Sequence, residues 1–142
     1  MTELMDAYGN AITEGASIGT FERETGFPTW NRYAAVNDEF VPIHMDDAAG
    51  AEAGMGAAFG MGNLQLSYLH NLVRNWMGDA GRIQKLSAQF RKPNLKGVVT
   101  ASGTVTSVTP GADGIVVELE VETVDAAGDK IAPGRATVVF PS

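Results

Sequence analysis

The chain has no cysteine among its 142 residues and only two histidines. The absence of cysteine excludes thiolate catalysis, disulfide bonds and cysteine-ligated metal sites. The sequence also has no long uncharged apolar run. The most apolar helical stretch, near residues 59–77, is too polar to span a bilayer, so we expect no membrane insertion; it includes Asn63, Gln65, His70, Asn71, Arg74 and Asn75.

Positive charge is scarce, with 10 Lys and Arg against 17 Asp and Glu, which gives a net charge of -7. A nucleic-acid-binding surface needs clustered basic residues, so this balance argues against one. Residues 1–6 are acidic and lack the basic and apolar segments of a signal peptide, so we expect a cytoplasmic protein. The length and a hydrophobic content of 44% predict one globular domain over residues 1–142, with residues 1–15 irregular.

Hydrophobic periodicity predicts one long helix in the middle of the chain. Large apolar side chains recur at three- and four-residue steps over residues 61–77, and Gly78 is expected to end this helix. A shorter helix is expected to begin at Pro28 and continue to Val36. Another short helical segment over residues 47–53 would have Asp46 as its N-cap.

The second half of the chain reads as β-structure. Alternating apolar and polar side chains predict strands at residues 18–24, 83–90, 98–108, 115–121 and 136–140. Short turns rich in Gly, Asp and Pro join the last of these, which favours an antiparallel meander. We therefore expect an α+β domain in which a curved antiparallel sheet wraps around the long helix.

Residues 33–47 say most about function. Asp38 and Glu39 are adjacent carboxylates a few residues before His44, and Pro42 stiffens the turn between them. A carboxylate and an imidazole on one short loop can hold a water or move a proton onto and off a substrate. The reference pKa of histidine, about 6.5, suits acid/base work.

When Pro42, His44 and Asp46 are anchored, residues 38–46 align without a gap with a known motif. The loop resembles the hydratase motif of the MaoC-like dehydratases, the family of (R)-specific enoyl-CoA hydratases. Phe59-Gly60-Met61 resembles the family's His-Gly-Met signature at the start of the central helix, and residues 87–93 resemble its strand ending in Phe-Arg-x-Pro. The similarity covers roughly residues 18–140.

The resemblance implies a hotdog fold and the reversible addition of water to a trans-2-enoyl-CoA, giving a 3-hydroxyacyl-CoA. The substrate would be a thioester of CoA or of an acyl-carrier protein. No metal and no separate cofactor are implied. Hotdog domains pair through their sheets, so we expect a homodimer or a heterodimer with another hotdog chain.

Several positions depart from the family pattern. Asp38 stands where the family has glycine, Glu39 where it has the catalytic aspartate, and Val41 where it has asparagine. The register favours Glu39 as the working carboxylate, whereas a remodelled loop would let Asp38 serve. Phe59 replaces the usual histidine. These losses leave open a non-catalytic subunit of a heteromeric hydratase, and a hotdog acyl-CoA thioesterase is a further alternative.

The resemblance also assigns roles around His44, which would be the general acid/base. The Gly60 N–H would hold the thioester oxygen, or the glycine would simply permit close packing. Phe59 and Met61 would contact the acyl group or belong to the core. A basic cluster would meet the phosphates of CoA or of a carrier protein's pantetheine arm, or form a solvated turn; it consists of Arg91, Lys92 and Lys96.

His70 falls on the more polar side of the predicted long helix. We expect it at the surface or in a subunit contact. No carboxylates can be placed beside the two histidines to complete a metal site, so none is predicted.

Overall fold

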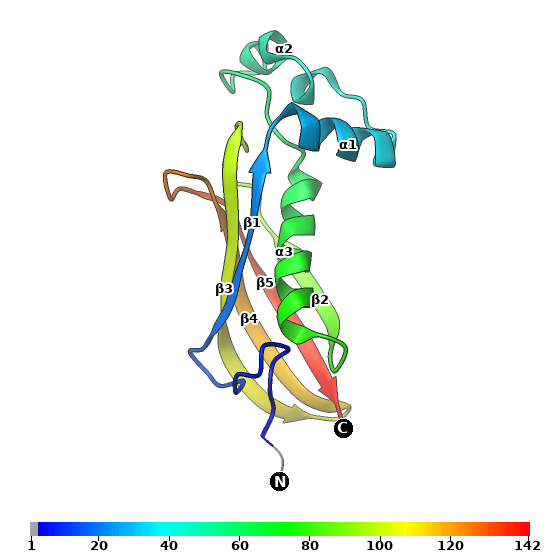
Figure 1. Cartoon of the computed structure of the whole chain (residues 1–142), viewed down its shortest axis with the longest axis vertical. Coiled ribbons are helices and arrows are strands. Elements are labelled where there is room, and N and C mark those ends of the chain that lie inside the picture. The colour runs from blue at the N-terminus through cyan, green and yellow to red at the C-terminus, as the bar shows by residue number, and fades with distance from the viewer. Residues whose placement is uncertain (1–2) are drawn as a thin grey trace.

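The computed structural model describes residues 3–142, which form one five-stranded antiparallel sheet and three α-helices (Figure 1). The elements in chain order are β1 (Ser17–Thr25), α1 (Phe27–Asn37), the 3-10 helix η1 (Pro42–His44), α2 (Asp47–Glu52), α3 (Gly62–Met77), β2 (Arg82–Ala88), β3 (Gly97–Gly111), β4 (Gly114–Val124) and β5 (Lys130–Pro141). The strand order is β1-β3-β4-β5-β2.

The long helix α3 lies along one face of the curved sheet and contacts all five strands (Figure 1). Its buried stripe includes Leu69, Leu72 and Trp76, which face a sheet core that includes Val105 and Val117. Burying each large aliphatic side chain contributes about 1.5–3 kcal/mol. This core confirms the predicted arrangement of a curved sheet around one helix.

β3, β4 and β5 follow one another as an antiparallel meander, and the other two strands join it from either side. β1 pairs with β3 and β2 pairs with β5, so β1 and β2 form the two edges of the sheet. The segment that carries α1, η1 and α2 lies beyond the start of α3 as an overhanging layer (Figure 1).

Four strands are longer than the sequence predicts, and two of them, β3 and β5, are extended through a proline. β5 begins at Lys130 rather than Ala136, and β3 continues to Gly111 rather than ending at Val108. Each extension contains a proline, Pro133 or Pro110, that pairs within the ladder. A proline breaks a strand only where its missing N–H faces the partner strand, so neither proline ends its strand here.

Residues 3–15 cover the far end of α3. They contain one isolated bridge, between Met5 and Ala11, and the Ala7 N–H donates to the Trp76 carbonyl oxygen. The Asp6 side chain holds this segment in shape by accepting hydrogen bonds from two backbone N–H groups. Within residues 3–142, no helix combines the length and the apolar character needed to cross a membrane.

Candidate active site

His44 is held in one orientation by a backbone hydrogen bond. It ends the 3-10 helix η1, which begins at Pro42, and its side chain is buried. Its Nδ1 lies 2.6 Å from the carbonyl oxygen of Phe59. A carbonyl only accepts, so Nδ1 carries the proton and Nε2 keeps its lone pair. The imidazole is thus presented as a base or hydrogen-bond acceptor through Nε2.

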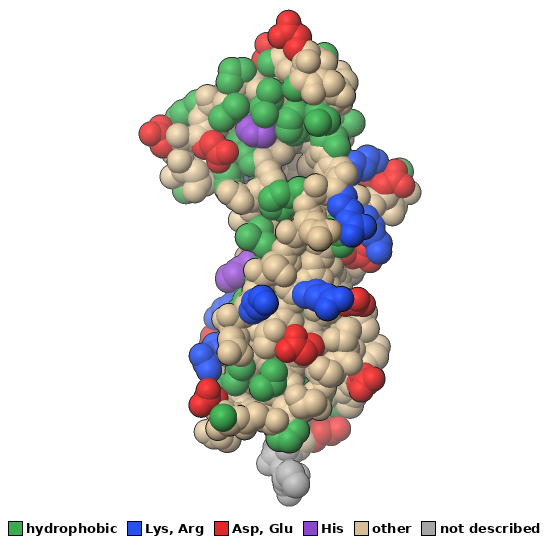
Figure 2. All heavy atoms as spheres, turned by 180° about the vertical axis from the view of Figure 1, so that it is seen from behind, with side chains coloured by type: hydrophobic (Ala, Val, Ile, Leu, Met, Phe, Trp, Pro, Cys, Tyr) green, Lys and Arg blue, Asp and Glu red, His purple; other side chains and the backbone are tan. Residues whose placement is uncertain are grey.

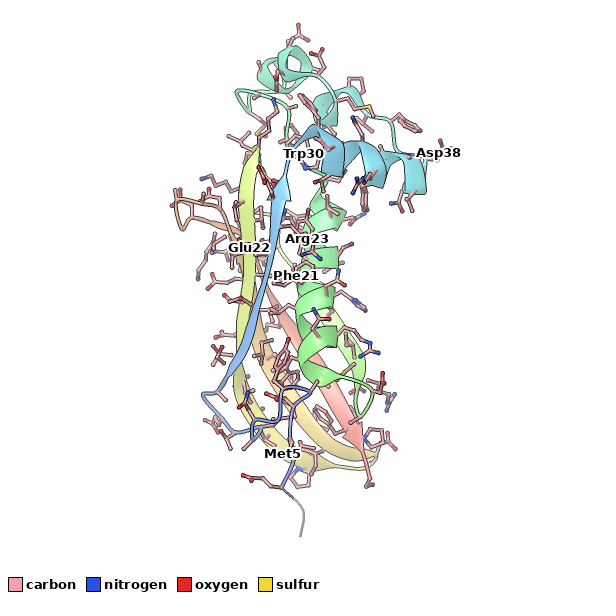
Figure 3. All side chains as sticks on the ribbon, viewed as in Figure 1. Met5, Phe21, Glu22, Arg23, Trp30 and Asp38 are labelled. Atoms are coloured by element: carbon pink, nitrogen blue, oxygen red, sulfur yellow. The ribbon has the colours of Figure 1, made fainter. Side chains whose placement is uncertain are left out.

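Asp38 adopts the backbone conformation that the motif reserves for glycine. Its φ is +53°, in the left-handed region, and it caps the end of α1. Figure 3 shows Asp38 at the outer end of α1, away from the sheet. This conformation supports the alignment in which Asp38 takes the glycine position and Glu39 takes that of the catalytic aspartate.

Glu39 follows as a half-buried residue whose N–H donates to the Ala34 carbonyl oxygen. Burial and, to a smaller extent, the negative charge of Glu39 raise the pKa of Tyr33. Among residues 3–142, no ion pair joins either Asp38 or Glu39 to His44. The structure therefore places Glu39 on the same short loop as His44 without an ion pair between the two side chains.

Gly60 is fixed by its backbone and by the lack of a side chain. Its N–H donates a hydrogen bond to the Asn94 carbonyl oxygen at 2.8 Å. While this bond is in place, the N–H is not available for the predicted contact with a thioester oxygen. A Cβ at Gly60 would lie 2.6 Å from Trp30 Nε1. This close approach of Trp30 agrees with the alternative interpretation, in which Gly60 permits close packing.

A pocket of about 310 Å³ opens beside His44's partner Phe59, at the start of α3. Met55, Phe59 and Phe90 give it apolar walls, and Gly60 and Gln65 come from the α3 side. Figure 2 shows hydrophobic side chains gathered over the end of the molecule that holds α1 and α2, above a hollow. An apolar pocket with a few polar groups suits an acyl chain attached to a polar head.

The family model described as "MaoC like domain" matches residues 16–127. The chain belongs to this family.

Solved structures share the fold of this MaoC-like domain. An (R)-hydratase from A. caviae involved in PHA biosynthesis is 23% identical, with a TM-score of 0.80, over 92% of this chain and 98% of that one. R-hydratase PhaJ1 from Pseudomonas aeruginosa is 16% identical, with a TM-score of 0.80, over 93% and 84%. The ChsH1-ChsH2 complex from Mycobacterium tuberculosis is 18% identical, with a TM-score of 0.78, over 90% of this chain and 98% of that one. These likenesses confirm the hotdog fold. Comparison with curated proteins gives no match.

Two of the three predicted phosphate-binding cations are already paired with carboxylates. The Nζ of Lys92 lies 2.7 Å from Asp125 and 2.9 Å from Asp129, and these hydrogen bonds raise the pKa of Lys92. The Nζ of Lys96 lies 2.7 Å from Asp47. The two lysines clamp the β4–β5 turn and α2 respectively, so carboxylates already compensate both charges, and their assignment to phosphates stays a prediction. Spacing along the chain did not reveal these distant partners.

Arg91 is the remaining member of that cluster. Its guanidinium is exposed, donates to Gln89 Oε1 at 3.0 Å and borders the pocket. A glutamine partner leaves its positive charge uncompensated. Arg91 therefore keeps the character expected of a phosphate contact.

The other predicted residues divide between the pocket and the rest of the molecule. Phe59 lies in the pocket wall, whereas Met61 is 1% exposed and does not line the pocket; it packs in the core, which was the alternative given for it. Met61 precedes the first turn of α3, where the apolar stripe of the helix begins. His70 is exposed on α3, as predicted.

The sequence analysis missed two buried polar residues at this site. Gln65 is 2% exposed and lines the pocket. It lies four residues after Met61 and three before Tyr68, so its place on the apolar stripe was a signal. Asn94 is 3% exposed, and its side chain bonds to Thr25 while its carbonyl fixes Gly60. Nothing in the local sequence around Asn94 indicates these distant partners.

Proposed function

We propose that this MaoC-like domain catalyses the reversible addition of water to a trans-2-enoyl thioester. The observation that carries the proposal is His44, a buried imidazole whose tautomer is fixed by the carbonyl oxygen of Phe59, a residue that also lines an apolar pocket. The family and the fold shared with two (R)-hydratases support the same reaction class. A thioester of CoA is the substrate form that we propose.

The reaction needs one carboxylate and one imidazole. Glu39 and His44 Nε2 hold a water, and one of them accepts its proton as the water oxygen bonds to the β-carbon. The π electrons of the double bond move toward the α-carbon and the thioester oxygen, which gives an enolate-like state. The α-carbon then takes a proton from the same pair. Water supplies every added atom and no electrons are exchanged, so we propose that no redox cofactor takes part.

Mixing the protein with crotonyl-CoA and longer enoyl-CoAs tests this function. Hydration removes the ultraviolet absorbance of the conjugated enoyl thioester, and we expect that loss with wild-type protein. His44→Ala should reduce the rate by about 10²–10⁴-fold. His70→Ala is the matched control because it removes the other, exposed histidine. Equal rates for wild type and His44→Ala would contradict the proposal.

A thiol reagent separates hydration from the alternative thioesterase chemistry. Hydration leaves the thioester intact, whereas hydrolysis of the carbonyl releases free CoA thiol. We expect loss of the enoyl absorbance without release of thiol. Thiol released at the rate at which absorbance is lost would favour the thioesterase.

We also propose that the chain works as a dimer, with a second copy or with another hotdog chain. Val36, Phe40 and Phe90 are exposed by 85%, 58% and 52%, and strands β1 and β2 leave edges that a second sheet could extend. The family departures at Val41 and Phe59 favour a subunit that depends on a partner. The mass in solution tests this: a stable monomer that is fully active contradicts it.

A further inference from the structure

Gln65 is a buried amide in an otherwise apolar stripe. It lies on α3 beside Leu64, Tyr68 and Leu69, which all belong to the core. It is 2% exposed, and its Oε1 has no hydrogen-bond partner among residues 3–142. A buried polar atom without a partner destabilises a fold, so a group held in this state calls for a reason outside packing.

The amide is buried but borders a space that a ligand can enter. Gln65 lines the pocket of about 310 Å³ together with Phe59 and Gly60. The carbonyl of Phe59 is the group that orients His44. Phe59 therefore connects the two groups, because its carbonyl oxygen orients the imidazole and it lines the same pocket as Gln65.

Other donors near this wall are already engaged or shielded. The Gly60 N–H donates to the Asn94 carbonyl oxygen, and the Asn94 side chain bonds to Thr25. Trp30 Nε1 also lacks a partner, but Trp30 is 0% exposed and lies behind Gly60. Lys92 is held by two carboxylates. Gln65 is thus an uncharged side chain that lines the described pocket and whose buried amide oxygen has no hydrogen-bond partner among residues 3–142.

We propose that the Gln65 amide binds the carbonyl oxygen of the thioester substrate, in the role that the family pattern gives to the Gly60 N–H. This inference rests on the proposed function. The amide nitrogen Nε2 is the hydrogen-bond donor of this side chain, and its soft, roughly two-fold terminal torsion lets the amide adjust without moving the stem. In the proposed complex Nε2 donates to the thioester oxygen. The bond strengthens as negative charge develops on that oxygen, because a donor to a charged acceptor binds more tightly.

Two ligands that differ only at the carbonyl test the contact. Butyryl-CoA carries the thioester oxygen, and S-butyl-CoA replaces the carbonyl with a methylene. We expect Gln65→Met, which roughly conserves volume, to weaken butyryl-CoA binding about tenfold and to leave S-butyl-CoA binding unchanged. The variant should also lower kcat for crotonyl-CoA about a hundredfold. Without ligand it should melt at a higher temperature, because the unpartnered amide is gone.

Gln84→Met is the matched control, since Gln84 is exposed on β2 and outside the pocket; it should change neither affinity. Gln65→Asn keeps an amide but withdraws it by one methylene, so it should show the same selective loss if Gln65→Met fails to fold. Equal weakening of both ligands, or no weakening, overturns the assignment while leaving hydration intact. Wild-type protein that binds neither ligand overturns both proposals.

Discussion

The ring nitrogen Nδ1 of His44 lies 2.6 Å from the backbone carbonyl oxygen of Phe59. The bond joins the 3-10 helix η1 to the segment just before α3. Because the acceptor belongs to the backbone, this hydrogen bond does not require a histidine at position 59, and the Phe59 ring packs edge-on against the imidazole with the ring centroids 5.3 Å apart. The phenylalanine found where the family has histidine is therefore compatible with an oriented His44.

Phe59→Ala should keep His44 oriented and enlarge the pocket. We expect this variant to retain hydration of crotonyl-CoA. Its kcat/KM for longer enoyl-CoAs should rise relative to its kcat/KM for crotonyl-CoA, because an aromatic wall of the pocket is removed. A series of chain lengths measured with both proteins checks this. Loss of all activity, as in His44→Ala, would show that the ring itself holds the imidazole.

The two carboxylates of the loop should respond in opposite ways to substitution. Asp38 has a φ of +53°, so Asp38→Gly should relieve strain and stabilise the fold by about 1 kcal/mol while leaving kcat unchanged. Glu39→Gln should abolish hydration with little effect on stability. Urea unfolding and initial rates on both variants decide the matter, and the reverse pattern would transfer the catalytic role to Asp38.

Gly60→Ala should destabilise the protein by about 1–3 kcal/mol through overpacking. The added Cβ would lie 2.6 Å from Trp30 Nε1 and 3.1 Å from Cε2 of the same ring. Trp30→Phe removes the nearer atom, so the double variant should lose less than the sum of the two single losses. Additive losses in urea unfolding would mean that this contact is not the source of the destabilisation.

Asp47 should make the protein less stable at acidic pH than at neutral pH. A hydrogen bond from Lys96 is the largest cause that lowers the pKa of Asp47, and the Ala58 N–H adds to it. Since the folded pKa lies below the unfolded value of about 3.9, the contribution is complete above that pH and is lost as the pH falls through the folded pKa.

Asp47→Asn keeps an acceptor for Ala58 but removes the charge. The melting temperatures of wild type and Asp47→Asn should differ at neutral pH and converge in acid. Asp113→Asn is the control. It removes the charge of an exposed carboxylate that lies 3.8 Å from the Arg82 guanidinium, which is too far for a hydrogen bond. A difference that stays constant with pH would rule out the charge as its origin.

Arg91→Met should weaken the binding of substrates that carry phosphates and leave the binding of other substrates unchanged. We expect KM for crotonyl-CoA to rise about tenfold, and more weakly at high salt, while KM for the N-acetylcysteamine thioester of crotonate stays constant. Arg82→Met removes another exposed arginine as a control. An equal rise for both substrates would place Arg91 at the acyl group instead.

The sequence predicted those features that depend on neighbours along the chain. The α3 stripe, its end at Gly78 and the Asp46 cap of α2 follow from local periodicity and capping, and the structure confirms them. The glycine-like conformation of Asp38 agrees with the alignment that placed it there.

What the sequence could not provide depends on distant segments. Lys96 is paired with Asp47 across 49 residues, and Lys92 is paired with Asp129 across 37. Each lysine looked free beside its chain neighbours, and only the folded sheet brings in its partner. Gln65 was visible as a polar residue, but the pocket that it lines also takes Phe90 from the segment that follows β2.

The position of β5 between β4 and β2 also constrains the order in which the chain folds. β2 is made early, directly after α3, yet its described partner β5 is separated from it by β3 and β4. During synthesis β2 has no strand to pair with until Lys130–Pro141 has emerged. Only then can the sheet form over that side of α3. Such non-local pairing slows folding, so nascent chains that stop before β5 expose an unpaired strand to a chaperone or to aggregation.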